Sequence, residues 1–278
     1  MEKGPIGVFD SGYGGLTVLK EIVHLLPQYD YIYLGDNARA PYGPRSFETV
    51  YQYTLQCVKW FFKQGCPLVV LACNTASAKA LRTIQQNDLA KIDPSKRVLG
   101  VIRPTTEIIG QYSPAKKVGI MATNGTVQSK SYQIEIEKFY PDLEVYQQAC
   151  PVLVPLIENG EYDNSGTDFF IKKYTNALMM QDKNIDTVLL ACTHYPLIKE
   201  KIQASLPDNV QVIAQGSIVA NSLLDYLQRH PEMEERLTKN NALNFYTTDS
   251  TDDFDQNGSV FFGQTVRSKH LDLNSISC

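Results

Sequence analysis

The sequence predicts an α/β protein made of two similar halves. Short β-rich apolar runs alternate with segments whose apolar residues recur at helical spacing. Several runs, such as Leu68–Ala72, are apolar throughout, as expected for a parallel sheet covered on both faces. The strings Val69-Val70-Leu71-Ala72-Cys73 and Val188-Leu189-Leu190-Ala191-Cys192 are also nearly the same. A weak internal duplication explains them, and it predicts two doubly wound α/β domains related by a pseudo-twofold axis.

The first half is expected to contain four strands, over Ile6–Asp10, Tyr29–Gly35, Leu68–Ala72 and Val98–Ile102. A helix over Leu16–Leu26 fits the apolar spacing and is ended by Pro27. Ser46 can cap a second helix. This helix should end at Gly65, because glycine is the preferred residue just after the end of a helix. A third helix is predicted over Ala76–Gln86.

The second half repeats this alternation after Lys117. Its predicted strands and helices are, in chain order, the strand Val118–Ala122, the helix Ser129–Phe139, the strand Leu143–Gln148, the helix Phe169–Met180, the strand Thr187–Ala191 and a helix after Pro196. The tail from Val210 is more polar. Its two apolar segments, Leu243–Thr248 and Ser259–Phe262, are expected to close the fold.

Composition excludes several classes of protein. The chain has 278 residues, of which 43% are hydrophobic and 20% charged, as in a folded domain and unlike a disordered or low-complexity chain. The length suggests about two domains. With 26 basic against 30 acidic residues and a net charge of −4, there is no basic stripe, so nucleic acid is not the expected partner.

Neither a membrane nor a secretory segment is expected. The longest apolar stretches fall far below the ~20 residues of a spanning helix, and Asp10 interrupts any signal-peptide core. A cytoplasmic location follows. Six cysteines form no CxxC pair and no dense disulfide framework, and the four histidines add no metal-ligand spacing. Any cysteine with a function should therefore act as a thiol, without a metal.

Two of these cysteines, Cys73 and Cys192, stand directly after a predicted strand and ahead of a predicted helix. Ligands of parallel α/β sheets bind at the carboxyl ends of the strands. A helix N-terminus stabilises an anion and lowers the pKa of a thiol. A cysteine also packs well at a strand end, but the matching pair favours two reactive thiols in a cleft between the halves.

Two thiols facing each other suit the inversion of a stereocentre without a cofactor. One removes a proton, and the other delivers a proton to the opposite face. A carbon acid beside a carboxylate is far weaker than a thiol, so the site must stabilise the carbanion and exclude water. Small donors near the thiols suit an anionic substrate, and these are Ser11, Tyr42, Gly43, Asn74, Thr75, Thr126 and Thr193.

Three titratable residues are candidates to assist the thiols. Asp10 should lie near Cys73 if the first and third strands are neighbours, where it could position or accept a proton; as an alternative it is a turn or cap residue. His194 titrates near neutrality and could assist Cys192 in proton transfer. Glu158 could support the site from behind or be a solvated surface residue.

Competing motifs are weak. The run Gly12-Tyr13-Gly14-Gly15-Leu16-Thr17 follows a strand, but Thr17 occupies the place of the last glycine of a dinucleotide-binding fingerprint. A P-loop and an HExxH zinc motif are both absent from the sequence. A dinucleotide cofactor is therefore not expected.

Four segments together resemble the glutamate racemases of the aspartate/glutamate racemase superfamily. They are Gly7-Val8-Phe9-Asp10-Ser11-Gly12 with the glycines and Leu16-Thr17-Val18 after it, Gly35-Asp36 with Pro41-Tyr42-Gly43-Pro44-Arg45-Ser46, Ala72-Cys73-Asn74-Thr75-Ala76-Ser77-Ala78, and Cys192-Thr193-His194-Tyr195-Pro196-Leu197. Their order matches that of the family, and the similarity extends over nearly the whole chain. The resemblance implies cofactor-independent interconversion of L- and D-glutamate, which supplies D-glutamate for bacterial cell-wall peptidoglycan.

By matching position, the resemblance implies that Cys73 takes the proton from D-glutamate and Cys192 takes it from L-glutamate. Asp10 and His194 would assist, and the small donors named above would contact substrate. It also implies that the tail rejoins the first domain, giving domains of residues 1–98 plus 211–278 and of residues 99–210. Members of this family are commonly homodimers.

The sequence departs from the family pattern at two places. Arg103-Pro104-Thr105 replaces what is more often an acidic residue followed by Pro-Gly, and Ala214-Gln215-Gly216 stands where many members carry an aspartate. These differences bear on domain coupling and regulation. Three alternatives stay open: a racemase of aspartate or another amino acid, a non-catalytic amino-acid-binding protein on the same scaffold, and a cysteine hydrolase or transferase with His194 as base.

Overall fold

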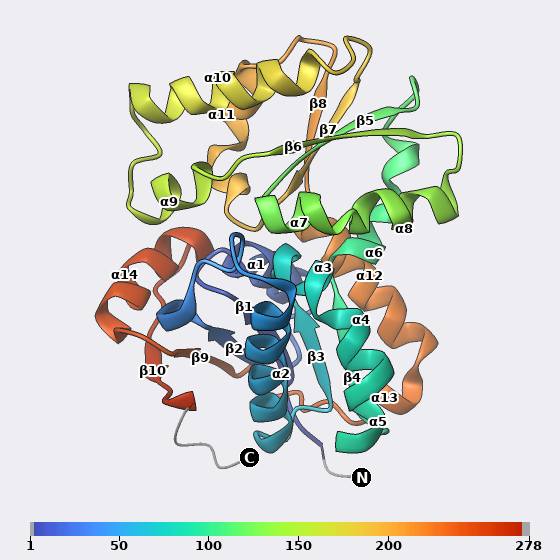
Figure 1. The fold of residues 1–278 in the computed structure, drawn as a ribbon. Helices are drawn as coiled ribbons and strands as arrows, with labels where there is room; N and C mark the ends of the chain where they lie inside the picture. The colour runs from blue at the N-terminus through green and yellow to red at the C-terminus, as the bar shows by residue number, and fades with distance from the viewer. Residues whose placement is uncertain (1–2, 274–278) are drawn as a thin grey trace.

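A computed structural model describes residues 3–273, which form two parallel sheets stacked end to end (Figure 1). The larger sheet has the strand order β10 (Ser268–His270), β9 (Leu243–Thr247), β2 (Tyr31–Gly35), β1 (Ile6–Asp10), β3 (Leu68–Leu71) and β4 (Arg97–Gly100). The smaller sheet has the order β6 (Glu144–Ala149), β5 (Lys117–Ala122), β7 (Thr187–Ala191) and β8 (Gln211–Ala214). We call the sheets with their helices the larger and the smaller unit.

The two units share one strand arrangement, which confirms the predicted similarity of the halves. In each, the second strand in sequence lies beside the first, the first beside the third, and the third beside the fourth, all parallel. Asp10 at the end of β1 thus corresponds to Ala122 at the end of β5. Cys73 and Cys192 follow the corresponding strands β3 and β7.

Helices cover both faces of the larger sheet. Successive residues of β1 point to opposite faces, so each face of the strand packs against a different helix. Val8 belongs to the hydrophobic cluster that contains Leu19 of α1 (Leu16–Leu25), and Phe9 to the cluster that contains Phe61 of α2 (Phe47–Lys63). Ser46 caps α2 as predicted, since its side chain accepts a 3.1 Å hydrogen bond from the Thr49 backbone N–H. The other helices of this unit are α3 (Asn74–Lys79), α4 (Leu81–Thr83), α5 (Leu89–Ile92), α12 (Gly216–Arg229), α13 (Pro231–Glu234) and α14 (Thr251–Phe262).

The smaller unit includes a helix that the sequence did not predict, α9 (Leu153–Glu158), which carries Glu158. The predicted helix over Ser129–Phe139 is wrong in its start. The chain forms α7 (Asn124–Ser129) and α8 (Ser131–Phe139), separated by Lys130 in the left-handed conformation with φ 55°. The remaining helices are α6 (Ile102–Thr106), α10 (Ser165–Met179) and α11 (Lys199–Ala204).

Three further element predictions need correction. The strand predicted to reach Ile102 ends at Gly100, and Ile102 begins α6, where Pro104 is tolerated in the first turn. The helix predicted from Ala76 starts at Asn74, directly after Cys73. The helix predicted from Phe169 starts at Ser165, where Asn164 caps it by accepting from the Thr167 backbone N–H. Ser259–Phe262, for which no type of element was predicted, forms the end of α14.

The chain crosses between the units twice, after β4 and after β8. The tail then returns to the larger unit, where α12 packs against α1 and β9 pairs with β2. The predicted limits of the two domains, at residues 98/99 and 210/211, stay a prediction. The first limit falls within β4, and β8 begins directly after the second. Over residues 3–273, none of the helices has the length and apolar character needed to cross a membrane.

Candidate active site

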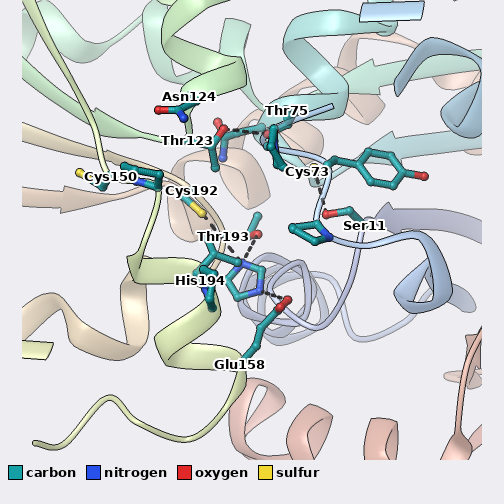
Figure 2. Close-up of a pocket in the computed structure, with 18 residues that line it drawn as sticks. Ser11, Cys73, Thr75, Thr123, Asn124, Cys150, Glu158, Cys192, Thr193 and His194 are labelled. Atoms are coloured by element: carbon teal, nitrogen blue, oxygen red, sulfur yellow. Dashed lines mark hydrogen bonds and ion pairs between the residues drawn. The ribbon is translucent and has the colours of Figure 1, made fainter. Parts of the chain in front are cut away.

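The carboxyl ends of the two sheets meet at a cavity of about 170 Å³ (Figure 2). Residues from both units line it, and they include ten of the residues singled out in the sequence: Ser11, Tyr42, Gly43, Cys73, Asn74, Thr75, Glu158, Cys192, Thr193 and His194. Two others, Asp10 and Thr126, are fully buried behind the lining. The roles assigned to all twelve stay predictions.

Cys73 enters the cavity from the larger unit. It is the residue before the first turn of α3, and its Sγ accepts a 3.4 Å hydrogen bond from the Ala76 backbone N–H. The thiol lies 3.6 Å from Ser11 Oγ. Burial, together with the nearby Asp10 carboxylate, raises the pKa of Cys73 to about 12. The predicted lowering of this pKa by the helix N-terminus is wrong, because burial disfavours the thiolate more than the helix start favours it.

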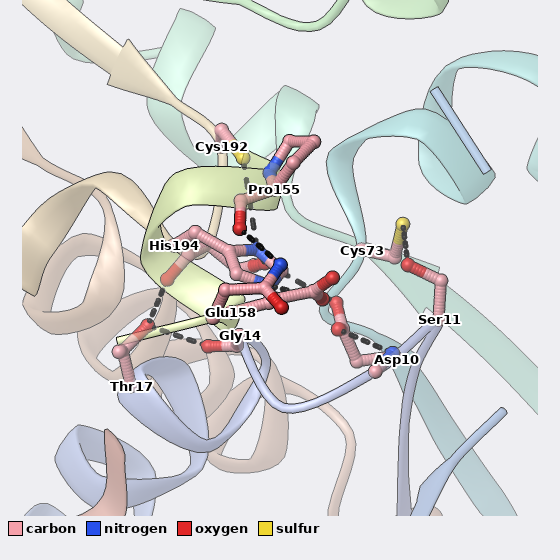
Figure 3. A network of polar contacts seen from close by, with 12 residues as sticks. Asp10, Ser11, Gly14, Thr17, Cys73, Pro155, Glu158, Cys192 and His194 are labelled. Carbon is pink, nitrogen blue, oxygen red and sulfur yellow. Dashed lines mark hydrogen bonds and ion pairs between the residues drawn. The ribbon is translucent and has the colours of Figure 1, made fainter. Parts of the chain in front are cut away.

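Cys192 enters the cavity from the smaller unit, on the other side from Cys73 (Figure 3). It is 5% exposed, and its Sγ lies 3.9 Å from His194 Nδ1. A single turn of 3₁₀-helix, Tyr195–Ile198, follows it with Pro196 in the first turn, before α11 begins at Lys199.

His194 connects this thiol to a carboxylate on α9. Its Nε2 lies 2.8 Å from Glu158 Oε1, while Nδ1 faces Cys192 (Figure 3). Burial lowers the pKa of His194, but the hydrogen bonds to Cys192 and Glu158 outweigh burial and hold the pKa well above its ordinary value. The imidazolium is therefore favoured, instead of the near-neutral titration expected from the sequence.

Asp10 lies between the two thiols in the fold, beneath the lining. Because β1 pairs with β3, the Cys73 backbone N–H reaches the Phe9 carbonyl at 3.4 Å, which confirms the predicted neighbourhood of Asp10 and Cys73. Asp10 Oδ2 accepts from the Gly12 backbone N–H at 3.0 Å, and Oδ1 accepts from Thr193 Oγ1 at 3.3 Å. Burial raises the pKa of Asp10, and the nearby His194 partly offsets that rise.

The glycine-rich turn after β1 brings the larger unit against the Cys192 loop. A Cβ at Gly14 would lie 2.3 Å from Thr193 Oγ1 and 2.4 Å from His194 Nδ1, so only glycine fits there. Beside it, Thr17 Oγ1 donates to the Thr193 carbonyl at 2.9 Å. This turn matches a dinucleotide-binding fingerprint only weakly in sequence, and in the structure it forms a close contact between the units.

The loop with Tyr42 and Gly43 covers another side of the cavity. The Tyr42 hydroxyl donates to the buried carboxylate of Asp36, which also pairs with Arg39 at 2.7 Å. Because its hydroxyl is engaged there, Tyr42 anchors the loop through Asp36.

Several lining residues were missed in the sequence. Thr123 follows β5 as Ser11 follows β1, and its hydroxyl lies 3.0 Å from that of Thr75 across the units. Cys150 follows β6 as Asp36 follows β2, and it adds a third buried thiol to the lining. The internal duplication was the signal that could have found both. The other missed lining residues are Pro41, Pro44, Asn124, Pro151, Val154 and Pro155.

The lining carries little formal positive charge. It contains neither Lys nor Arg, and His194 is its cationic group. Over residues 3–273, the structure gathers no group of three or more His, Cys, Asp or Glu side chains suited to a metal ion. The arrangement offers two thiols from opposite units, an imidazolium beside one of them, and neutral hydroxyl and amide donors around both.

Comparison with known proteins gives the same assignment along the chain. Residues 6–223 match the family described as Asp/Glu/Hydantoin racemase. A glutamate racemase of Streptococcus gordonii is 38% identical over 276 residues, covering 98% of this chain and 100% of that protein. The fold resembles that of a Bacillus anthracis glutamate racemase isoform, at TM-score 0.88 and 33% identity with coverage of 98% and 99%.

A glutamate racemase of Francisella tularensis, solved in complex with D-glutamate, is equally similar. It matches at TM-score 0.87 and 34% identity, over 99% of this chain and 100% of that chain. Sequence and fold therefore agree over nearly the full length described. The chain belongs to the Asp/Glu/Hydantoin racemase family.

Proposed function

We propose that this protein is a glutamate racemase, an isomerase that interconverts L- and D-glutamate without a cofactor. The observation that carries the proposal is the pair Cys73 and Cys192, one from each unit, on opposite sides of one cavity. Its relatives in Streptococcus gordonii and Francisella tularensis are named glutamate racemases, and the latter was solved with D-glutamate.

In the direction from D- to L-glutamate, the Cys73 thiolate removes the α-proton and becomes a thiol. The electron pair of the broken C–H bond stays on the α-carbon and is delocalised into the α-carboxylate. The Cys192 thiol then delivers its proton to the opposite face and becomes a thiolate. The product is L-glutamate, and the reverse direction runs with the two thiols exchanged.

The buried position of Cys73 suits so weak a carbon acid. A thiolate whose thiol has a pKa near 12 is a stronger base than an exposed thiolate. The difference between the pKa of the thiol and the pKa of the substrate α-C–H is therefore smaller, and proton transfer costs less free energy. The cost is a small thiolate population at neutral pH. The α-ammonium of the bound substrate supplies a positive charge near Asp10 and Cys73 that offsets this cost.

On the other side, the His194 imidazolium stabilises the Cys192 thiolate after proton delivery. Glu158 keeps His194 protonated, and Thr193 connects His194 to Asp10 through contacts of 3.5 and 3.3 Å. The substrate carboxylates are bound by neutral donors from Ser11, Asn74, Thr75, Thr193 and the Tyr42-Gly43 loop, with Thr126 supporting Thr123 at 3.2 Å. Such preorganised donors stabilise the charge that develops on the carboxylate.

The test is to incubate the protein with L- or D-glutamate in D₂O without any added cofactor, after dialysis against EDTA. Optical rotation should fall to zero from either enantiomer, while deuterium enters the α-position of the product. L-aspartate is the control substrate and should show neither change. Loss of rotation with aspartate alone would assign an aspartate racemase, and no exchange with either amino acid would exclude a racemase of glutamate or aspartate.

The biological setting is part of the same proposal. D-Glutamate made here would enter bacterial peptidoglycan, in support of cell-wall synthesis and cell shape, and the reaction would take place in the cytoplasm. Free thiols at Cys57, Cys66, Cys73, Cys150 and Cys192 are in keeping with a reducing compartment. We also propose a homodimer, which light scattering on the purified protein tests directly: a monomer mass would overturn it.

A further inference from the structure

A buried hydrogen-bonded ring joins the two units beside the cavity. It consists of Asn74 from the larger unit, Tyr132 of α8 from the smaller unit, and Gln215 at the crossing between β8 and α12. These side chains are 3%, 0% and 4% exposed. The Tyr132 hydroxyl donates to Asn74 Oδ1 at 2.5 Å, Asn74 Nδ2 donates to Gln215 Oε1 at 2.8 Å, and Gln215 Nε2 donates to the Tyr132 hydroxyl at 2.7 Å.

The direction of this ring is fixed by the other crossing between the units. Gln215 Nε2 also donates to Thr105 Oγ1 at 2.8 Å and reaches the Val101 carbonyl at 3.2 Å. The Thr105 hydroxyl donates its proton to the Val101 carbonyl at 3.1 Å, so the Thr105 oxygen can only accept from residue 215. The Gln215 amide therefore has one orientation, and through it the Asn74 amide has one as well.

The ring bears on the proposed active site because Asn74 follows Cys73 and lines the cavity. The ring uses one of the two N–H groups of Asn74 Nδ2 and leaves the second for a ligand. Because Tyr132 belongs to the smaller unit, the ring closes only at the present separation of the units. The ring therefore couples the orientation of Asn74 to the approach of the two units.

We propose that Gln215 is a positioning residue, which holds the Asn74 amide ready for a substrate carboxylate when the two units are closed. Glutamine is suited to this place because it accepts from Asn74 and donates to Tyr132 and Thr105 at once. A glutamate of the same shape would only accept. Tyr132 would then donate to residue 215, Asn74 Oδ1 would lose its donor, and the Val101 carbonyl would face a carboxylate.

The role rests on the proposed glutamate racemisation and is tested with Gln215→Glu in the full-length enzyme. We expect KM for D-glutamate to rise about ten- to a hundred-fold, the order expected for a lost hydrogen bond to a charged group, with a smaller change in kcat. In the Asn74→Ala background, Gln215→Glu should change KM by no more than about two-fold, because its effect passes through Asn74.

Gln211→Glu is the matched control, since it makes the same chemical change at the exposed start of β8 and should leave KM unaltered. If Gln215→Glu does not fold, Tyr132→Phe keeps the packing and removes the ring hydroxyl, and it should raise KM in the same way. A normal KM in a folded Gln215→Glu or Tyr132→Phe variant, even one with a lowered melting temperature, would overturn the positioning role. An equal rise in KM in the Asn74→Ala background would overturn it as well.

Calorimetry of D-glutamate binding separates this inference from the proposed function. If the unsubstituted protein binds glutamate but does not racemise it, the proposed function fails, and the same variants are compared by Kd instead of KM. If it neither binds nor racemises glutamate, both proposals are overturned.

Discussion

His194 lies between a carboxylate and a thiol, with Nε2 2.8 Å from Glu158 Oε1 and Nδ1 3.9 Å from Cys192 Sγ. The imidazole is buried, while the Glu158 side chain retains 20% exposure to solvent. The carboxylate thus keeps a partly hydrated position from which it stabilises a charge on a buried ring. This relation makes the protonation of His194 depend on Glu158.

Replacing Glu158 by Gln should therefore move the pH dependence of activity. Glu158 raises the pKa of His194, so its removal lowers that pKa, and the imidazolium is lost at a lower pH. We expect the alkaline fall of kcat/KM to begin at lower pH. At a fixed pH on that limb, kcat/KM should drop about ten-fold for each unit by which the pKa of His194 falls. Both directions should shift together, because the equilibrium constant of a racemisation is one.

The pH profile of racemisation, followed by optical rotation, checks this shift. Glu137→Gln, an exposed position on α8, is the control and should keep the original profile. An alkaline limb that moves upward in Glu158→Gln, or stays in place, would contradict the role given to the Glu158 carboxylate.

Of the three thiols that line the cavity, Cys73 and Cys192 should be equally indispensable. Cys73→Ala and Cys192→Ala should each abolish racemisation, because either change removes the thiol that we assign as the base on one face of the α-carbon. Cys66→Ala provides the matched control, since Cys66 is also a buried free thiol with a pKa raised to about 12 but does not line the cavity. Near-normal turnover in either cavity variant would disprove the two-thiol mechanism.

The reactivity of Cys73 should respond to Asp10. Burial is the main cause of the raised pKa of Cys73, and the Asp10 charge raises it further. Asp10→Asn removes only the second contribution, so the pKa of Cys73 should fall and its thiolate fraction at a fixed pH should rise. We expect faster alkylation of Cys73 by iodoacetamide at pH 8, measured by mass spectrometry of the Cys73 peptide.

Cys66 serves as the internal reference in the same alkylation experiment, because Asp10 does not contribute to its pKa. Its rate should be equal in both proteins. Slower alkylation of Cys73 in Asp10→Asn would show that the carboxylate does not oppose the thiolate.

The close approach at Gly14 should tolerate no side chain. In Gly14→Ala the new Cβ would lie within 2.4 Å of both Thr193 Oγ1 and His194 Nδ1, so the Cys192 loop must shift. Displacement of catalytic groups by about 1 Å costs on the order of a hundred-fold in rate, and we expect a loss of kcat/KM of that size. Gly166→Ala, whose Cβ would come no closer than 3.2 Å to another residue, should remain active.

Circular dichroism and the melting temperature of both glycine variants show whether each is folded. A folded Gly14→Ala variant with full activity would mean that the loop does not depend on this contact.

Local sequence patterns were sufficient to predict the main elements and the two thiols. Apolar runs and helical periodicity depend on neighbouring residues, so β1 and β7 have the predicted limits. The near-identical strings before Cys73 and Cys192 indicated a duplicated strand end, and the shared strand order accounts for it. The sequence analysis missed the break between α7 and α8 at Lys130 and the start of α6 at Ile102. Both depend on helix caps and on packing between helices.

Only the tertiary structure decided the electrostatics and the coupling of the site. Whether Cys73 has a raised or a lowered pKa depends on how deeply the strand end is buried and on the charge of Asp10, which is 63 residues earlier in the chain. The contacts of Glu158 with His194, and of Gln215 with Asn74 and Tyr132, join elements distant in sequence. Such long-range contacts leave no periodic pattern, because they form only when the two units come together.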